Sequence, residues 1–213
     1  MSRHNNRDQL RKSLLKQRSA LSTSQRKRAA RALVSQLLHV PQILKAKRLI
    51  SYVPVRGEIS AEELLKHTRA ESIYIPQITD YAAGQMRFCL ADDRQLKNLS
   101  TLSRQQLKLN QFKIPEPTVN NLGLPPRLAD VVFVPLVAFD LAGNRIGMGA
   151  GFYDRAFAFR KWHITTRKPL LVGLAHAFQQ VDAIAKQPWD VPLDVIITPE
   201  QTIWVSSNHD SQR

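Results

Sequence analysis

Apolar residues recur along the chain at two spacings, one typical of helices and the other of strands. Near the N-terminus, leucines at helical spacing predict an amphipathic helix over residues 7–20. A second helix is expected to begin after Ser22, because Ser22 and Gln25 have the spacing of a capping box, in which each side chain bonds the other residue's backbone N–H. Pro41 is expected to limit that helix, since proline interrupts the helical hydrogen-bond ladder.

Short apolar runs rich in β-branched residues predict strands. They fall at residues 48–53, 72–75, 86–90, 130–139, 170–175, 194–198 and 202–205. A short helix is expected over residues 60–67, where Ser60 and Glu63 form a second capping-box pattern, and another over residues 152–162. The proline-rich stretch 91–127 is expected to be an irregular but ordered loop.

Strands that alternate with helices predict an α/β fold, with a mainly parallel sheet and helices on both of its faces. The 213 residues are enough for one sizeable α/β domain. We therefore expect residues 1–205 to form a single domain and residues 206–213 to be a disordered tail. Because ligands bind at the carboxyl ends of strands in such sheets, the functional site is expected there.

A glycine-rich stretch after the predicted strand 130–139 carries the clearest chemical signal. Gly147, Gly149 and Gly151 stand at alternate positions, where the missing Cβ lets the backbone turn tightly and approach a ligand. Their N–H groups, at the start of the next predicted helix, are suited to an anion. Asp154 offers an oxygen ligand to a magnesium ion that accompanies phosphates. The pattern predicts nucleoside triphosphate binding, although a purely structural turn also fits it.

Two common phosphate-binding motifs do not match this stretch. The glycines are not followed by Gly-Lys-Ser/Thr, so it is not a Walker A loop. Its G-x-G-x-G spacing also differs from the G-x-G-x-x-G of dinucleotide-binding folds. A triphosphate site here would therefore belong to another class.

The net charge of +14 is concentrated at the N-terminus. Residues 1–31 hold ten Lys and Arg residues against the single acid Asp8, which gives +9 of the +14. Such a basic segment suits either a nucleic acid or a small polyanion such as ATP. The first aromatic residue is Tyr52, so the basic segment has no stacking platform for bases, which counts against nucleic acid.

Cysteine content and hydropathy bear on the cellular setting. Cys89 is the only cysteine, so no intrachain disulfide is possible, and it is expected to be a small buried residue of strand 86–90. Residues 1–8 are polar and no apolar run approaches the length of a membrane span. We expect a cytoplasmic monomer that does not bind membranes.

The longest recognisable motif runs from Val134-Pro135-Leu136-Val137-Ala138-Phe139-Asp140 through the glycines to Asp154. Further motifs are Leu10-Arg11, Glu58-Ile59, Ile114-Pro115-Glu116-Pro117, Gly173-Leu174-Ala175 and Trp189-Asp190-Val191-Pro192-Leu193-Asp194. In content and order, these motifs resemble those of the 5-formyltetrahydrofolate cyclo-ligases, also called methenyltetrahydrofolate synthetases. The resemblance covers nearly the whole chain.

The resemblance implies a three-layer α/β/α sandwich, in agreement with the pattern of strands and helices. It also implies an enzyme that uses ATP and Mg²⁺ to cyclise 5-formyltetrahydrofolate into 5,10-methenyltetrahydrofolate, with release of ADP and phosphate. In this reaction the formyl oxygen attacks the γ-phosphate to give a phosphorylated iminium. The neighbouring bridge nitrogen then attacks the activated carbon, and phosphate leaves. The protein mainly positions the reactants and neutralises charge.

By their match to the family's motifs, two segments are expected to bind ATP. The first lies in the basic helices of residues 1–40, where Arg7 and Arg11 are expected to reach the phosphates and Arg18 is a further candidate. The second supplies Arg145, Ile146, Gly147, Met148, Gly149, Ala150, Gly151, Phe152 and Tyr153. Of these, Arg145 and Tyr153 are expected to be catalytic. The family often has Lys at the position of Arg7, Gly at that of Ala150 and Tyr at that of Phe152.

The resemblance also assigns the folate and metal contacts. Val53 and Glu58 are expected to bind the folate, with the carboxylate of Glu58 accepting hydrogen bonds from the pterin. The wall shared by folate and ATP is expected to be Met148, Gly149, Ala150, Gly151 and Phe152. Asp154 and Asp190 match the family's magnesium-binding carboxylates.

Two other functions remain open on the sequence alone. One is a nucleic-acid-binding protein that uses residues 1–31 and whose affinity falls steeply with salt. The other is a different enzyme on a related three-layer fold, such as a sugar-phosphate isomerase, which would need no ATP.

Overall fold

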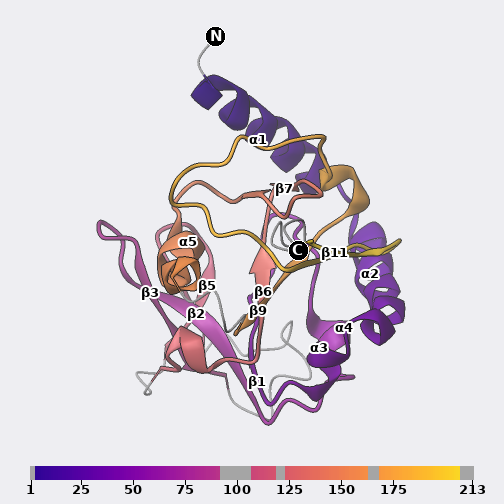
Figure 1. Ribbon diagram of the computed structural model, residues 1–213, viewed down its shortest axis with the longest axis vertical. Helices are drawn as coiled ribbons and strands as arrows, with labels where there is room; N and C mark the ends of the chain where they lie inside the picture. The colour runs from indigo at the N-terminus through magenta and orange to yellow at the C-terminus, as the bar shows by residue number, and fades with distance from the viewer. Residues whose placement is uncertain (1–2, 92–106, 119–122, 163–167, 207–213) are drawn as a thin grey trace, which may run out of the picture.

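The computed structural model describes residues 3–91, 107–118, 123–162 and 168–206. At its centre is a seven-stranded sheet in the order β11-β10-β9-β6-β1-β2-β3 (Figure 1). The strands are β1 Arg48–Ile50, β2 Ser72–Asp80, β3 Gln85–Leu90, β6 Val131–Pro135, β9 Leu170–Leu174, β10 Val195–Ile197 and β11 Thr202–Trp204. All neighbours pair in parallel except the edge strands β3 and β11. The predicted α/β class with a mainly parallel sheet is confirmed.

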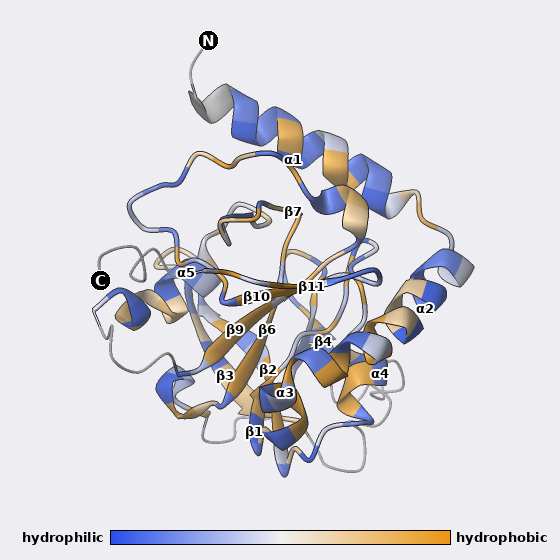
Figure 2. Ribbon diagram, turned by 45° about the vertical axis from the view of Figure 1, so that its right-hand side comes forward, coloured by the Kyte–Doolittle hydropathy of each residue, from blue (hydrophilic) through white to orange (hydrophobic). Residues whose placement is uncertain are grey.

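Two layers of helices cover the sheet, as Figures 1 and 2 show. One face carries α2 Thr23–Ala32, the 3₁₀ helix Leu33–His39, α3 Pro41–Lys45 and α4 Glu62–Leu65, and the other carries α5 Phe152–Ala156 and the 3₁₀ helix Ala158–Lys161. Residues of β6 alternate between the two cores: Val131 and Phe133 pack on the α2 side, while Val132 and Val134 pack on the α5 side. Because both faces are buried, the strand is apolar at every position from 131 to 134.

The basic helix α1, Arg3–Ser19, lies across the end of the sheet at which β6 finishes (Figure 1). It packs on the hairpin of β7 Ala138–Phe139 and β8 Arg145–Ile146. A third apolar cluster joins them: Leu14, Val137, Ala138, Ile146 and Ile184. This packing brings the N-terminal arginines to the carboxyl ends of the strands.

Three predicted elements are divided differently in the structure. The expected strand 130–139 is two strands, because β6 ends at Pro135 and the chain then turns into β7. The expected helix 152–162 breaks at Phe157 into α5 and a 3₁₀ turn. Pro41 does not simply end the second helix; it is the first residue of α3, where its missing N–H costs nothing.

The two capping-box predictions had different outcomes. Around Ser22 and Gln25 the reciprocal bonds are present, so that prediction is confirmed. The prediction for Ser60 and Glu63 is wrong, because α4 begins one residue later than the pattern requires. The Ser60 hydroxyl accepts from the N–H of Glu62, and Glu63 pairs with Lys66 instead.

The predicted irregular stretch 91–127 contains a small hairpin of β4 Leu107–Leu109 and β5 Pro115–Pro117. Residues 92–106 and 119–122 of this stretch lie outside the described part of the chain, as do residues 207–213 of the predicted tail. The prediction for Cys89 is confirmed: it is buried in β3 as a free thiol. Within the described residues, none of the helices is long and apolar enough to cross a membrane.

Candidate functional site

A cavity of about 140 Å³ lies where the carboxyl ends of β1 and β6 meet the glycine-rich stretch. We call it the central cavity. Ten of the residues predicted from the sequence line it: Val53, Glu58, Arg145, Gly147, Met148, Ala150, Gly151, Phe152, Tyr153 and Asp154. Further walls come from β2, β3 and the β4–β5 hairpin. Folding thus brings the expected folate contacts, more than 80 residues apart in the chain, against the expected ATP loop.

The glycine loop, residues 147–151, needs glycine at two positions for its backbone shape. Gly149 has φ +108° and Gly151 has φ +68°, a region that other residues rarely adopt. Gly151 also precedes the first residue of α5. Between described residues, no backbone hydrogen bond has an N–H of this loop as its donor. These amides are therefore free to bind an acceptor on a ligand.

Arg145 and Asp154 form a half-buried ion pair beside this loop. Arg145 Nη2 lies 2.7 Å from Asp154 Oδ1, and Arg145 Nη1 donates to the carbonyl of Val191. The same Asp154 oxygen accepts from the Val191 N–H at 3.0 Å. The pair thus connects β8, α5 and the segment that carries Asp190.

Arginines of α1 extend this network to the other predicted carboxylate. Arg7 Nη1 lies 3.0 Å from Asp190 Oδ2 and 2.9 Å from the carbonyl of Ala185. Arg11 pairs with Asp8 and its Nε donates to the Gly147 carbonyl at 3.0 Å. Arg7, Arg11 and Asp190 do not line the central cavity; the two arginines instead reach the backbone carbonyls of Arg145 and Gly147.

Asp154 and Asp190 each have a carboxylate oxygen that could bind a magnesium ion. Each commits one oxygen to an arginine and a backbone N–H: Oδ1 of Asp154 and Oδ2 of Asp190. The second oxygen of each carboxylate accepts no hydrogen bond from a described residue. Among those residues there is no cluster of three or more His, Cys, Asp or Glu side chains that could hold a metal alone. Two carboxylate oxygens completed by phosphate and water match the way Mg²⁺ binds with a nucleotide.

Glu58 is held in the cavity wall by a buried arginine. Arg18 is 1% exposed and Glu58 8%, and Arg18 Nη2 lies 3.4 Å from Glu58 Oε1. The other guanidinium donors reach the carbonyls of Leu136 and Arg56, at 2.7 and 3.0 Å. Burial raises the pKa of Glu58, and the positive charge of Arg18 opposes that rise.

The role of Arg18 differs from the sequence prediction. It was a further candidate for binding phosphate, but its side chain is inside the protein and is engaged by Glu58 and two carbonyls. The sequence contains a signal for this, since Arg18 follows the buried Leu14 by four residues and therefore lies on the same face of α1.

The hydroxyl of Tyr153 is buried and has no hydrogen-bond partner. Among the described residues that line the central cavity, it is the only side-chain polar atom in this state. Burial, and next the nearby charge of Glu58, raise the pKa of its hydroxyl, which is therefore protonated at neutral pH. The neighbouring Tyr52 hydroxyl, in contrast, donates to the carbonyl of Ile59 at 2.7 Å. A buried hydroxyl without a partner is costly, so a ligand that bonds to it would relieve the cost.

Three other residues complete the comparison with the sequence. The Ile146 side chain is packed against α1 in the third apolar cluster, so only its backbone can face a nucleotide. Phe152 lines the cavity and makes an edge contact with Phe112, at 6.3 Å between centroids. His176, two residues beyond the end of β9 at Leu174, is buried, with Nε2 3.2 Å from the carbonyl of Gly57.

Known proteins resemble this chain over nearly its whole length. The model of the 5-formyltetrahydrofolate cyclo-ligase family matches residues 3–199. A 5-formyltetrahydrofolate cyclo-ligase of Haemophilus influenzae is 34% identical over 195 residues, which cover 90% of this chain and 97% of that protein. The Escherichia coli K12 enzyme of the same name is 30% identical over 190 residues, covering 88% and 96%.

Solved structures show the same fold. The NMR structure of the 5,10-methenyltetrahydrofolate synthetase of Aquifex aeolicus superposes with a TM-score of 0.70 at 27% identity, covering 97% of this chain and 99% of that one. The Mycoplasma pneumoniae synthetase gives 0.63 at 25% identity, covering 91% and 98%. From its motifs, its fold and these relatives, the chain belongs to the 5-formyltetrahydrofolate cyclo-ligase family of enzymes.

Proposed function

We propose that the protein uses ATP and Mg²⁺ to cyclise 5-formyltetrahydrofolate to 5,10-methenyltetrahydrofolate, with release of ADP and phosphate. Family membership supports the reaction. The observation that best supports this reaction in the structure is the central cavity. Its wall contains both the predicted folate contacts and the glycine loop, together with the unpartnered hydroxyl of Tyr153. In this setting we propose a single-domain, cytoplasmic monomer.

On the folate side, the pterin ring would occupy the central cavity. Glu58 would accept hydrogen bonds from the amino and ring N–H groups, and it is already oriented by Arg18 and by the N–H of Val55 at 3.0 Å. Val53, Met148 and Phe152 provide apolar walls. At about 140 Å³ the cavity is smaller than the roughly 300–1,000 Å³ of sites that enclose a drug-sized ligand, so the rest of the folate would extend outside.

On the nucleotide side, the triphosphate would lie along the glycine loop. The free amides of residues 147–151 would bind phosphate oxygens, with Arg7, Arg11 and Arg145 as surrounding positive charge. The free carboxylate oxygens of Asp154 and Asp190 would hold Mg²⁺, which neutralises phosphate charge when it is bound.

In the proposed reaction the formyl oxygen attacks the γ-phosphorus and the bond to ADP breaks, which gives the phosphorylated iminium. The bridge nitrogen then bonds to the formyl carbon, loses its proton, and phosphate departs with the former formyl oxygen. The Tyr153 hydroxyl has no acceptor among the described residues, so it would be free to donate a hydrogen bond to the formyl oxygen that leaves with the phosphate. Arg145, fixed by Asp154 and Val191, would stabilise the negative charge of the transferred group.

The test is to mix the protein with 5-formyltetrahydrofolate, ATP and Mg²⁺ and to follow the absorbance of the methenyl product. We expect product to form only when all components are present, with one ADP released per product. Failure of product to appear at saturating substrates would refute the assignment.

The nucleic-acid hypothesis gains no support. Arg7, Arg11 and Arg18, three of the basic residues on which it depended, form ion pairs and hydrogen bonds within the protein. They are engaged around the proposed site and do not form a free basic surface for a nucleic acid.

A further inference from the structure

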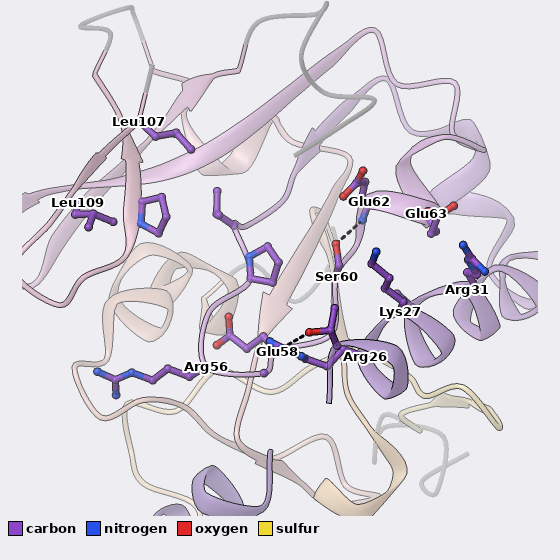
Figure 3. Close-up of a pocket in the computed structure, with 16 residues that line it drawn as sticks. Arg26, Lys27, Arg31, Arg56, Glu58, Ser60, Glu62, Glu63, Leu107 and Leu109 are labelled. Atoms are coloured by element: carbon purple, nitrogen blue, oxygen red, sulfur yellow. Dashed lines mark hydrogen bonds between the residues drawn. The ribbon is translucent and has the colours of Figure 1, made fainter. Parts of the chain in front are cut away.

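The β4–β5 hairpin supplies one wall of the central cavity, although none of its residues takes part in the chemistry proposed above. Four residues of this hairpin line the cavity: Asn110, Ile114, Pro115 and Glu116. Figure 3 shows Leu107 and Leu109 of β4 across an open recess of about 980 Å³ from Lys27 and Arg31 of α2. Because this recess separates the hairpin from α2, the position of the hairpin depends on its contacts with the sheet.

The edge of the sheet beside the hairpin is one that β2 leaves open. Strand β1 ends opposite Tyr74, and β2 continues beyond that point. Tyr74 accepts from the Ser51 N–H on the β1 side, and backbone groups of alternate strand residues point to the same side. Pro76 and Ile78 therefore face the open edge. Pro76 has no N–H to satisfy there, but Ile78 has one.

Glu116 of the hairpin satisfies this N–H in place of a neighbouring strand. Its Oε1 accepts from the Ile78 N–H at 2.9 Å. Between Pro115 and Pro117, Glu116 has the only backbone N–H of β5, so β5 cannot extend the sheet by an ordinary ladder. Side chains make the connection instead, and Gln77 adds a second one by donating to the Pro117 carbonyl at 2.7 Å.

The same oxygen of Glu116 also fixes the turn of the hairpin. Asn110 Oδ1 accepts from the N–H groups of Phe112 and Ile114, at 2.8 and 3.0 Å, and so closes the turn. The side-chain amide of Asn110 in turn donates to Glu116 Oε1 at 2.7 Å. One carboxylate oxygen thus joins the turn to the sheet. Ile114 lies in this turn and lines the cavity, so its position relative to the sheet follows from that of Glu116.

We propose that Glu116 is a positioning residue for the folate: it fixes the hairpin against β2 and thereby sets the width of the central cavity. This inference rests on the proposed function, in which the pterin ring occupies that cavity. Glu116 acts through the hairpin and not on the reacting atoms. Its second oxygen, Oε2, accepts no hydrogen bond from a described residue, so its role requires one acceptor oxygen at the position of Oε1.

The test measures kcat and the KM values for 5-formyltetrahydrofolate and ATP in Glu116→Ala. We expect the folate KM to rise about 10-fold, since a hydrogen bond to a charged acceptor is worth about that factor or more. The ATP KM and kcat should change by less than about 2-fold, because the hairpin wall contacts only the folate in the proposed arrangement. Asn110→Ala, which breaks the link from the turn to the same oxygen, should also raise the folate KM.

Two further variants show whether the acceptor oxygen is what matters. Glu116→Gln should restore most of the folate affinity, because its amide oxygen can accept both hydrogen bonds. Its NH₂ group would take the position of Oε2, where no described donor is bonded. The matched control is Glu71→Ala, which removes an exposed acid that pairs with Lys47 and does not line the central cavity. It should leave both KM values unchanged.

Limited digestion with trypsin tests the hairpin itself, without turnover. Lys113 is exposed in its turn. We expect cleavage after Lys113 to be faster in Glu116→Ala than in the parent or in Glu116→Gln, because the turn is no longer joined to the sheet. 5-Formyltetrahydrofolate without ATP should slow this cleavage in the parent.

The other outcomes contradict the inference in different ways. An unchanged folate KM in Glu116→Ala, or unchanged cleavage after Lys113, would show that Glu116 does not hold the wall. If Glu116→Gln is impaired as much as Glu116→Ala, the substrate needs the charge of the carboxylate and not the hairpin contact. A joint loss of kcat, of both substrate affinities and of thermal stability would show a general structural role. If the parent protein does not turn over the substrates, the proposed function fails and this inference with it.

Discussion

Tyr52 and Tyr153 are neighbouring tyrosines with buried hydroxyls, and these hydroxyls differ in one respect. The hydroxyl of Tyr52 has an acceptor within the protein, and that of Tyr153 does not among the described residues. Groups that are unsatisfied in a free enzyme but line its cavity are candidates for contact with the reactants. At the scale of single residues, this difference separates a structural role from a functional one.

Replacement of Tyr153 by Phe should therefore lower activity without lowering stability. We expect kcat to fall by about 10²-fold, the cost of one lost donor to a transition state. The free energy of unfolding in urea should stay the same or rise by up to about 1 kcal/mol, because an unsatisfied hydroxyl is removed. As a control, Tyr52→Phe should cost about 1–3 kcal/mol by leaving the Ile59 carbonyl unpaired. A loss of stability in Tyr153→Phe with kcat unchanged would contradict the assigned role.

Asp154→Asn tests the metal assignment. We expect lower turnover and a higher Mg²⁺ concentration for half-maximal rate, with the circular dichroism spectrum retained. Because Asp154 also pairs with Arg145, some loss of stability is expected in addition, about 1–3 kcal/mol. Asp194→Asn is the matched control. Asp194 forms an ion pair with Arg160, with 2.6 Å between Nη1 and Oδ2, and neither residue lines the central cavity. It should lower stability and leave the Mg²⁺ dependence unchanged; an unaltered Mg²⁺ dependence in Asp154→Asn would remove the metal role.

At the scale of elements, His176 joins the end of β9 to the loop that follows β1. Its Nε2 lies 3.2 Å from the Gly57 carbonyl, and Gly57 is adjacent to the folate-binding candidate Glu58. Burial lowers the pKa of His176, and the charges of Arg18 and Arg26 lower it further, against the raising effects of Gly57 and Glu200. The imidazole is therefore neutral in the folded protein at neutral pH.

This pKa shift predicts how stability depends on pH. Because the pKa is lower in the folded state than in the unfolded state, where it is about 6.5, the unfolded chain binds the proton first. The contribution of His176 is present above about pH 6.5 and is lost as the pH falls below it, by at most about 1.4 kcal/mol per pH unit. Denaturation at several pH values should show a shallower acid slope for His176→Asn than for the parent. A variant of the exposed His67 serves as control, and an equal effect of both would contradict the prediction.

The elements that were predictable from sequence are those whose determinants are local. The buried strands β6, β9 and β10 stand out as apolar runs, and the capping box at Ser22 needs only Gln25. In contrast, the sequence predicts that the second strand ends at residue 75, but β2 continues past Pro76. Its pairing with β1 ends at Tyr74, opposite Ile50, and beyond that point β2 is held by its pairing with β3. Pro115 and Pro117 likewise argue against a strand, yet β5 forms because β4 lies beside it. Pairing of this kind depends on distant residues that the local pattern does not contain.

The same distinction applies to the candidate site. The glycine loop and Asp154 are contiguous, so their chemistry is visible in the sequence. The pair of Arg18 and Glu58 is 40 residues apart and forms only when α1 docks on the strand ends. A guanidinium near the N-terminus therefore suggested phosphate binding, and only its burial shows that it supports Glu58.

At the scale of the whole molecule, three parts of the chain meet at the proposed nucleotide site: α1, the β8–α5 segment and residues 185–191. They are held by the ion pairs Arg7–Asp190 and Arg145–Asp154. A metal-bound nucleotide that contacts all three parts would bind the folded protein and not the unfolded chain, and so stabilise it as a unit.

We therefore expect ATP with Mg²⁺ to raise the midpoint of thermal unfolding. At a ligand concentration of about 100 times Kd the gain is about 2.7 kcal/mol, or roughly 5–10 °C for a chain of this size. ATP with a chelator, or Mg²⁺ alone, should give much less, because the two aspartates have too few donors to hold the metal without phosphate. Asp154→Asn should remove the difference between ATP with and without Mg²⁺, while Asp194→Asn should keep it. An equal shift for ATP with the metal and with the chelator would show that the carboxylates act only as partners of Arg7 and Arg145.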